Sequence, residues 1–433
     1  MSSGPVGKHA APRREGWARS KWALIVGVMV VVAGVAGGVV AIAANQGPSA
    51  AQKRAQAEAV AAAQRAAQEA AIHQSQAALL QSITVTPASG TANVALDSAV
   101  TVSTSSGTLA AVKVVSAGGA AVTGTLAAPG RWVASGSLLP STSYTVTVSV
   151  TGQGVSVGHT STFTTLTPAA TVTASVFPDT GMTVGVGQPV VVTFNHDVTS
   201  TAVQKAIDAR LTVAMSKPVA GGWYWFNDHE LHFRPVSFWP VGEKVQVSGD
   251  MSGIDVGGGE WTAGTVLDSF GIGDARISYA NLQTERMTVT LDGATLYSYP
   301  LSGGSTQWPT MSGIHIVMDR ESVVHMVSST VGIPVQSPGG YDEYVYDDVH
   351  ISDSGEYVHA APWSVASQGI TNVSHGCINL SPTNAAQFFG FSRVGDIVEV
   401  TGSPRPPAWG DHGVMDWSGP AWSQWTPAHV VAI

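Results

Sequence analysis

The hydrophobic pattern of this chain begins with residues 22–44, a run that contains no charged side chain. A run of this length spans a bilayer as one helix, whereas the apolar part of a signal peptide is shorter, about 7–15 residues. Basic residues precede the run at Lys8, Arg13, Arg14, Arg19 and Lys21. Because positive charge keeps a flanking segment in the cytoplasm, residues 1–21 are predicted to be a cytoplasmic tail and 22–44 an anchor. Residues 41–43 (Ala-Ile-Ala) would suit cleavage, but the length favours an uncleaved anchor.

Residues 45–81 are rich in Ala and Gln, which are good helix formers. No large apolar residue recurs at helical spacing before Leu79 and Leu80. The segment is therefore predicted to be a helical stalk rather than a core element. The absence of an apolar seam argues against a coiled coil.

Polar and β-branched residues alternate with period two from Ile83 onward, as in 98–104 and 143–150. This pattern predicts an antiparallel sandwich over 82–166. A second set of strands at 190–194, 230–233 and 244–247 predicts another over 167–272. Both are expected to be immunoglobulin-like. Four aromatic residues in the second set are assigned to its core and rim, with a carbohydrate platform as the alternative: Trp223, Trp225, Phe233 and Trp239.

A third region is predicted over 273–402, mostly β with one short helix. Strands at 287–291 and 294–299 flank Asp292-Gly293, a pair that suits a type I′ hairpin turn. Further strands are expected at 314–318, 322–327 and 396–400. Ser381 followed by Pro382 predicts a helix start, with the helix running to 389. The tail at 403–433 is dense in Pro and Trp, so it is expected to pack on a neighbouring domain.

Composition narrows the classes of function. Charged residues make up 11% of the chain and the formal net charge is −9. Because residues 1–21 are basic, the rest of the chain is more acidic still, which leaves no large basic face for nucleic acid. The single cysteine, Cys377, cannot form an internal disulfide.

The free thiol stands in the motif Ser374-His375-Gly376-Cys377-Ile378-Asn379, and His359 lies upstream. A lone cysteine is most often a small buried hydrophobe. Here a histidine two residues away and small polar neighbours favour a catalytic nucleophile activated by an imidazole. Gly376 would let a substrate carbonyl approach the backbone and leave the Cys377 amide free for an oxyanion hole.

Two segments together resemble the actinobacterial branch of the L,D-transpeptidases with a YkuD fold. They are the Cys377 motif and His359-Ala360-Ala361-Pro362-Trp363. The strings at 230–235 (Glu-Leu-His-Phe-Arg-Pro) and 238–242 (Phe-Trp-Pro-Val-Gly) resemble the immunoglobulin-like domain that precedes the catalytic domain in that family.

The resemblance implies a reaction. Cys377 would attack the carbonyl of the third residue of a peptidoglycan stem tetrapeptide, expel D-Ala, and pass the acyl group to the side-chain amine of a second stem, giving a 3→3 cross-link. His359 would be the base, oriented by the Ala360 carbonyl. His375 and Gly376 would support the site, with Gly376 at the oxyanion backbone. The implied substrate contacts are Tyr341 (a lid tyrosine), Trp363, Ser374 and Asn379. No cofactor is implied, and the family is a carbapenem target.

This chain departs from the wider family at two positions. Ala360 stands where the family often has Gly, and Asn379 stands where it often has Arg. Neither change removes a reacting group. Both affect how the substrate carboxylate would be held.

Three other interpretations remain. An L,D-carboxypeptidase would use the same thioester with water as the acceptor. A non-enzymatic adhesin would suit tandem sandwiches on a stalk but would leave the Cys377 motif without a purpose. No metal site is predicted, because His-Glu-x-x-His is absent and His229, Glu230 and His232 fall on alternating strand positions. The predicted location is the cell membrane, single-pass, with the catalytic domain outside.

Overall fold

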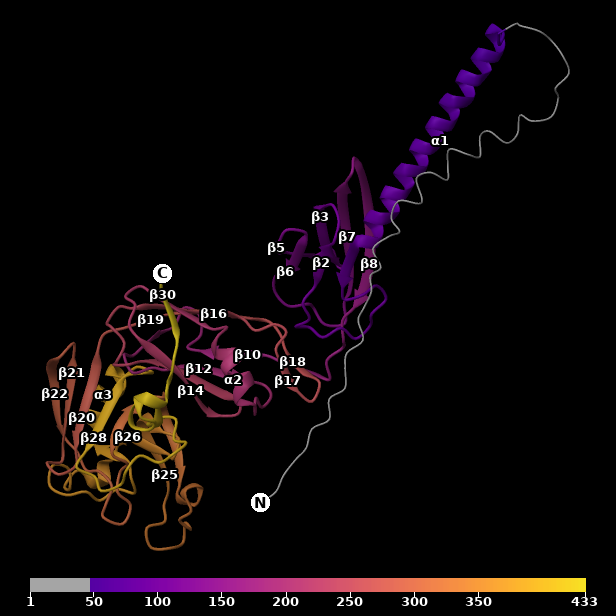
Figure 1. The fold of residues 1–433 in the computed structure, drawn as a ribbon. Helices are drawn as coiled ribbons and strands as arrows, with labels where there is room; N and C mark the ends of the chain where they lie inside the picture. Colours follow the sequence, from indigo (N-terminus) through magenta and orange to yellow (C-terminus); the bar gives the residue numbers. More distant parts are fainter. Residues whose placement is uncertain (1–46) are drawn as a thin grey trace, which may run out of the picture. The chain divides into compact units, whose positions relative to one another are not determined.

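The computed structural model describes residues 47–433 (Figure 1). The predicted cytoplasmic tail at 1–21 and the predicted anchor at 22–44 lie outside the described residues. Among the helices of residues 47–433, none is both long enough and apolar enough to cross a membrane.

The Ala- and Gln-rich segment forms one helix, α1 (Ala50–Ser82), with exposed side chains along most of its length. Its last turn differs from the predicted stalk. Leu79 is 3% exposed and belongs to the first hydrophobic core with Val148 and Val150. The expectation that this segment contributes nothing to a core is therefore wrong at its end, because Leu79 packs with the buried residues of the neighbouring sheets.

Two four-stranded sheets follow α1 and enclose that core. In β7, Tyr144, Val146, Val148 and Val150 are buried while the residues between them face outward, as the period-two pattern predicted. One sheet has the order β1 (Ile83–Thr86), β2 (Thr101–Thr104), β6 (Arg131–Ala134) and β5 (Gly124–Ala128). The other has the order β4 (Ala121–Val122), β3 (Thr108–Ser116), β7 (Ser143–Gly152) and β8 (Val155–Thr164).

Two five-stranded sheets and a short three-stranded sheet form the next layered unit, with α2 (Thr201–Asp208) beside them. The first sheet runs β10 (Ala174–Phe177), β12 (Val190–Phe194), β15 (Glu230–Pro235), β14 (Gly221–Asn227) and β29 (Thr426–Pro427). The second runs β11 (Thr183–Val184), β19 (Thr265–Ile272), β16 (Lys244–Asp250), β13 (Thr212–Met215) and β30 (His429–Ala432). The small sheet is β17 (Asp255–Gly257), β18 (Glu260–Thr262) and β9 (Ala170–Val172).

The aromatic residues of this unit lie in its core. Trp223, Phe233 and Trp239 are each no more than 2% exposed, and Trp225 packs on Phe194 with ring centroids 5.2 Å apart. This confirms the core assignment and leaves none of the four as an open platform for a sugar.

The C-terminal tail contributes strands to the same unit. β29 pairs with β14 and β30 runs parallel to β13, so the tail extends both sheets at their edges. Arg234 lies over the rings of Trp417, Trp422 and Trp425, with its guanidinium carbon 4.6–5.1 Å from their centroids. Cation–π contacts of this kind fix the tail against the sheet that carries Arg234.

The third region consists of two further sheets with α3 (Pro382–Phe391) packed against the second. One sheet runs β22 (Ala294–Pro300), β21 (Arg286–Leu291), β20 (Arg276–Asn281), β28 (Ile397–Thr401) and β23 (Gly313–Ile316). The other runs β24 (Asp319–Val327), β25 (Asp342–Ser352), β26 (Glu356–Ala360) and β27 (Ile378–Leu380). The remaining short helices are η2 (Ser328–Val331), η3 (Pro362–Ser364), α4 (Met415–Ser418) and η4 (Trp422–Gln424).

The local signals in this region are confirmed. Asp292 and Gly293 both have positive φ, at 49° and 84°, as a type I′ turn requires, and Leu291 pairs with Ala294. Ser381 caps α3 by accepting from the Asn384 amide at 3.3 Å. The helix ends at Phe391, two residues beyond the predicted end.

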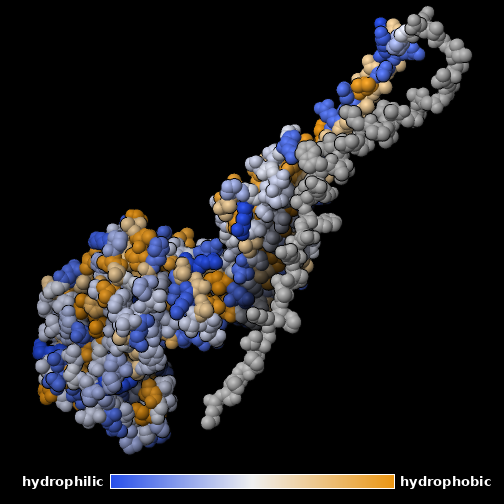
Figure 2. Space-filling model, viewed as in Figure 1, coloured by the Kyte–Doolittle hydropathy of each residue, from blue (hydrophilic) through white to orange (hydrophobic). Residues whose placement is uncertain are grey.

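The third region and the second sheet unit share a tight backbone contact. The Gly187 amide donates to the Gly395 carbonyl at 2.9 Å, and a Cβ at Gly185 would lie 2.2 Å from the Asp396 nitrogen. Only glycine permits this approach. Ile316 and Ile397 also belong to the hydrophobic core of the preceding unit. On the face shown in Figure 2, hydrophobic residues are scattered among polar ones over these parts of the chain.

Candidate active site

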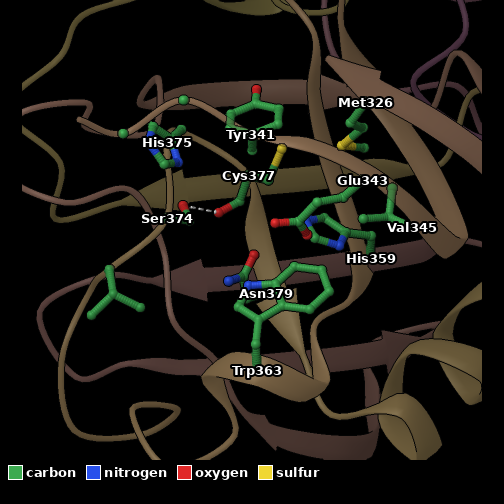
Figure 3. A pocket seen from close by; sticks show the side chains of 13 residues that line it. Met326, Tyr341, Glu343, Val345, His359, Trp363, Ser374, His375, Cys377 and Asn379 are labelled. Atoms are coloured by element: carbon green, nitrogen blue, oxygen red, sulfur yellow. Dashed lines mark hydrogen bonds between the residues drawn. The ribbon is translucent and has the colours of Figure 1, made fainter. Parts of the chain in front are cut away.

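Cys377 lies immediately before β27, beside the strand that carries His359. β26 and β27 are parallel, with Val358 opposite Ile378 and His359 opposite Asn379. This register brings the two motifs recognised in the sequence to one end of the sheet. They line a cavity of about 270 Å³ (Figure 3). Every predicted site residue except Gly376 lines this cavity: Tyr341, His359, Trp363, Ser374, His375, Cys377 and Asn379.

His359 is buried and oriented by its own strand. Its Nδ1–H donates to the Ala360 carbonyl at 3.1 Å, so the lone pair is on Nε2. Burial lowers the pKa of His359 to about 4, against the opposing effect of that hydrogen bond. At neutral pH the imidazole is therefore uncharged and able to accept a proton through Nε2.

The Cys377 thiol is uncharged in the same conditions. Its Sγ donates to the Gly355 carbonyl at 3.8 Å. Burial raises the pKa of the thiol to about 12, and the carboxylates of Glu356 and Asp348 act in the same direction. The resting site is therefore a neutral thiol beside a neutral imidazole, and the thiolate forms only as the proton moves to His359. Catalytic hydrogen bonds commonly tighten only when substrate is bound.

The turn before Cys377 is fixed by Ser374. Its Oγ accepts from the Gly376 amide at 3.1 Å and donates to the Cys377 carbonyl at 2.6 Å (Figure 3). The Gly376 amide is thus already engaged, which corrects its predicted part in the oxyanion hole and leaves the Cys377 amide as the backbone donor to consider. Gly376 has φ of 135°, and a Cβ there would lie 3.3 Å from Glu356 Oε1. Its contribution is conformational.

Aromatic rings enclose one side of the cavity. His375 lies between Trp308 and Tyr341, with ring centroids 4.3 Å and 5.1 Å away, and burial lowers its pKa. Burial also raises the pKa of Tyr341 to about 12, which keeps its hydroxyl protonated and able to donate. In the view of Figure 3 that hydroxyl points away from the thiol. The Tyr341 amide donates to Ser328 Oγ at 3.0 Å, and the Tyr341 carbonyl accepts from the Ser328 amide at 3.0 Å.

Asn379 and Trp363 form the opposite side. The Asn379 Nδ2 donates to Ser364 Oγ at 3.0 Å, while its buried Oδ1 has no protein partner among the described residues. Trp363, on η3, is 56% exposed and lies at the rim. A free acceptor at the base and an exposed ring at the rim suit a substrate that carries donors at one end.

Several lining residues carry no signal in the sequence. Met326, Glu343 and Val345 come from β24 and β25, and neither strand contains a recognised motif. Glu356 is buried behind Gly376, where burial raises the pKa of its carboxyl to about 7. The sequence predicts a strand at 322–327, within β24, but it does not predict β25, and the register of the two strands decides which side chains reach the thiol.

Five histidines of the third region and the C-terminal tail are engaged elsewhere. His315 is bonded to the carbonyls of Met311 and Ile351, His325 to Asp342 and His350 to Asp319. His412 and His429 contact β15 and β13 respectively, away from Cys377.

Comparison with known proteins places this geometry in context. The family model of the L,D-transpeptidase catalytic domain, YkuD, matches residues 275–400. The family model of a bacterial Ig domain matches residues 91–255. The chain is 38% identical over 355 residues to L,D-transpeptidase 2 of Mycobacterium tuberculosis, covering 82% of this chain and 86% of the relative. It is 32% identical over 318 residues to L,D-transpeptidase 5 of the same species, covering 68% of each.

Solved structures similar to this chain include the LD transpeptidase LdtMt1 in complex with imipenem, at 38% identity and a TM-score of 0.47. That match covers 54% of this chain and all of the other. An L,D-transpeptidase from Mycobacterium smegmatis is 37% identical with a TM-score of 0.46, covering 53% of this chain and 99% of the other.

Proposed function

The chain belongs to the L,D-transpeptidase family, and we propose that it forms 3→3 cross-links between peptidoglycan stem peptides through a thioester on Cys377. One observation carries the assignment of the reacting groups. The His359 Nδ1–H donates to the Ala360 carbonyl, so Nε2 is the nitrogen that can accept a proton. His359 lines the same cavity as Cys377, the only cysteine in the sequence.

The first half-reaction consumes the donor stem. Cys377 Sγ attacks the carbonyl of the third residue while its proton passes to His359 Nε2. The tetrahedral oxyanion accepts hydrogen bonds from the Cys377 amide and, after a rotation, from the Tyr341 hydroxyl. Collapse breaks the peptide bond, and His359 returns the proton to the leaving amine of D-Ala. The product is a thioester on Cys377.

The second half-reaction uses the acceptor stem. Its neutral side-chain amine attacks the thioester and passes a proton to His359 Nε2. The C–S bond breaks, the new peptide bond remains, and His359 returns the proton to Cys377 Sγ. Glu343 and the unpartnered Oδ1 of Asn379 are the acceptors on the cavity wall that suit an ammonium or amide donor. Trp363 offers an apolar face at the rim.

We further propose that residues 22–44 anchor the chain, with residues 1–21 in the cytoplasm and the catalytic domain outside the membrane. The uncharged run and its basic flank support this arrangement. Residues 45–81 and two tandem immunoglobulin-like sandwiches, 82–166 and 167–272, would then carry the catalytic domain, 273–402, towards the wall. Fractionation of cells tests the anchor, because a chain lacking 1–45 should move from the membrane to the soluble fraction while still reacting with a carbapenem.

Mass spectrometry of the chain incubated with disaccharide-tetrapeptide tests the reaction. Loss of D-Ala together with a cross-linked dimer is expected. Loss of D-Ala with only a tripeptide product would instead show an L,D-carboxypeptidase. The Cys377→Ser variant is the control, and product formation by that variant at the wild-type rate would overturn the assignment of the nucleophile. An adhesin would give neither product nor a stoichiometric imipenem adduct.

A further inference from the structure

A second cluster of reactive side chains lies away from the cysteine, where the C-terminal segment meets β15. Oε1 of Glu230 is 3.1 Å from Nε2 of His232 and 3.0 Å from Nδ1 of His412. All three ligand atoms lie within 4.8 Å of one another. Glu230 and His232 are two positions apart on one strand, so they share a face of the sheet.

Two of the three residues have an outer hydrogen-bond partner that turns a ligand atom inward, and a carboxylate lies near the third. Asp416 Oδ1 accepts from His232 Nδ1 at 2.9 Å, which leaves His232 Nε2 facing Glu230. Asn227 Nδ2 donates to the other oxygen of Glu230 at 3.1 Å. Asp353 lies 3.9 Å from the far nitrogen of His412. Carboxylates behind ligating histidines are the usual way in which proteins orient a metal site.

Burial also points to a bound ion. His232 and Asp416 are each 2% exposed, and Asp416 Oδ2 has no protein partner within residues 47–433. Three carboxylates, those of Glu230, Asp353 and Asp416, surround the two imidazoles. Against the opposing effect of burial, Asp416 and Glu230 raise the pKa of His232 to about 9, so a bound cation would take the place of an imidazole proton.

We propose that Glu230, His232 and His412 bind one zinc ion. Two imidazoles and a carboxylate are ligands that suit Zn²⁺, at distances of about 2.0–2.2 Å. Tetrahedral ligands at that radius lie roughly 3.3–3.6 Å apart, so the two spacings between Glu230 Oε1 and the histidine nitrogens need to widen by a few tenths of an ångström. The two histidine nitrogens lie within 4.8 Å of each other. His232, His412 and Asp416 also line a small cavity that leaves room for a water molecule as the fourth ligand.

The ion would join parts of the chain that are distant in sequence. His412 and Asp416 lie in the C-terminal segment and Glu230 and His232 on β15. The neighbouring Asp411 accepts from Ser352 Oγ at 2.7 Å and from the Asp353 amide at 3.1 Å, on the turn between β25 and β26. Zinc at this point would clamp the C-terminal segment to the sandwich and, through Asp411, to the turn that precedes Gly355. Its role would be structural, and Cys377 does not contribute.

Metal analysis of the full-length chain, purified in detergent, tests the proposal. All variants carry Cys377→Ser so that the thiol cannot bind the ion. Titration with Zn²⁺ is expected to reach one equivalent and raise the unfolding temperature, and Co²⁺ should give the intense visible absorption of a tetrahedral site. Glu230→Gln and His412→Asn should abolish both signals, while Asp416→Asn should weaken affinity about 10–100-fold. His229→Gln is the matched control, because His229 is exposed and outside the cluster.

Equal binding by His229→Gln and wild type, with loss in the Glu230 and His412 variants, supports the site. Absence of zinc uptake by the parent chain would overturn the proposal. The cluster would then be only two imidazoles hydrogen-bonded to the Glu230 carboxylate. Uptake that survives Glu230→Gln and His412→Asn would also overturn it, because the ion would then lie elsewhere. Unfolding curves recorded without metal show whether each variant is folded. If the Glu230 and His412 variants do not fold, Asp416→Asn still tests the site, because it retains all three ligands.

Discussion

Arg405 donates to the buried carboxylate of Glu356 at 2.6 Å, and this pair lies directly behind the catalytic turn. Glu356 also accepts from the Met311 amide at 2.9 Å, and its Oε1 faces the Cα of Gly376. It begins β26, three residues before His359. Arg405, in the C-terminal segment, therefore supports both the start of β26 and the turn before β27 through the carboxylate of Glu356.

Removing Arg405 should destabilise the fold more than it alters the chemistry. Arg405→Met leaves the Glu356 carboxylate buried without its cation, which costs about 1–3 kcal/mol. Denaturant unfolding at pH 8, above the Glu356 pKa of about 7, measures the loss. Glu356→Gln combined with Arg405→Met is the control, since a neutral amide needs no cation and the double variant should recover part of the stability. A loss as large in the double variant as in the single one would contradict this account.

The same carboxyl predicts a pH dependence of stability. Burial raises the pKa of Glu356 in the folded chain to about 7, above its ordinary value. The folded state therefore holds this proton more tightly than the unfolded state. Its contribution is fully present below the unfolded pKa and is lost as the pH rises through about 7. Urea unfolding from pH 4 to 8 should show this decline in wild type, and Glu356→Gln should lack it.

Alkylation of Cys377 should report a protonated thiol. Because burial raises its pKa to about 12, the iodoacetamide rate should keep rising with pH beyond the value of about 8.5 at which a free cysteine titrates. The reaction is followed by mass spectrometry, with a cysteine peptide for comparison. A rate that reaches its plateau below pH 8 would show that the resting site is a thiolate–imidazolium pair.

His359→Ala should lose on the order of 100- to 10,000-fold in acylation by imipenem, the range for a general base. The wild-type rate should fall only when the pH approaches 4, because burial lowers the pKa of His359 to about 4. Stopped-flow measurement of β-lactam absorbance follows both. His325→Ala is a suitable control, because His325 pairs with Asp342 at the protein surface. An acylation rate that halves near pH 6.5 would contradict a buried neutral base.

Tyr341→Phe separates an oxyanion donor from a lid. If the hydroxyl stabilises the oxyanion, its loss should raise the acylation barrier by up to about 2.7–4 kcal/mol, the range for one donor. If Tyr341 only packs on His375, Phe preserves the ring and acylation should hardly change. Single-turnover acylation measures the difference. Equal rates for Phe and wild type would remove the hydroxyl from the mechanism and leave Cys377 and His359 unaffected.

Gly376→Ala should impair the site through backbone strain. The φ of 135° is unfavourable for any residue with a Cβ, and the added atom would meet Glu356 Oε1 at 3.3 Å. Strain of this kind costs about 1–3 kcal/mol, and acylation should slow because the Cys377 amide is displaced. Gly390→Ala is the control, since a Cβ there meets nothing within 4 Å and lies in a helix. Equal stability and acylation of the two variants would argue against the strain.

Much of this molecule can be predicted from its sequence because the signals are local. Alternation along β7, the Asp292-Gly293 turn and the Ser381 cap each depend on neighbours within a few residues. The Cys377 motif and His359 are likewise predicted to be reacting groups from the residues beside them in the chain. Their meeting in space follows from the parallel pairing of β26 and β27, which period-two patterns alone do not specify.

The sequence by itself determined the strand-rich architecture and the helix at α1, and it singled out Cys377 and His359 as candidate reacting groups, since backbone propensity and side-chain chemistry reside in single residues. Tertiary structure decided the rest. It buried Leu79 in a sandwich, committed the Gly376 amide to Ser374, and set Arg405 against Glu356. It also brought His412 to Glu230 and His232, which no spacing in the sequence indicates. These contacts join residues far apart along the chain, so they depend on how whole sheets and the C-terminal segment pack together.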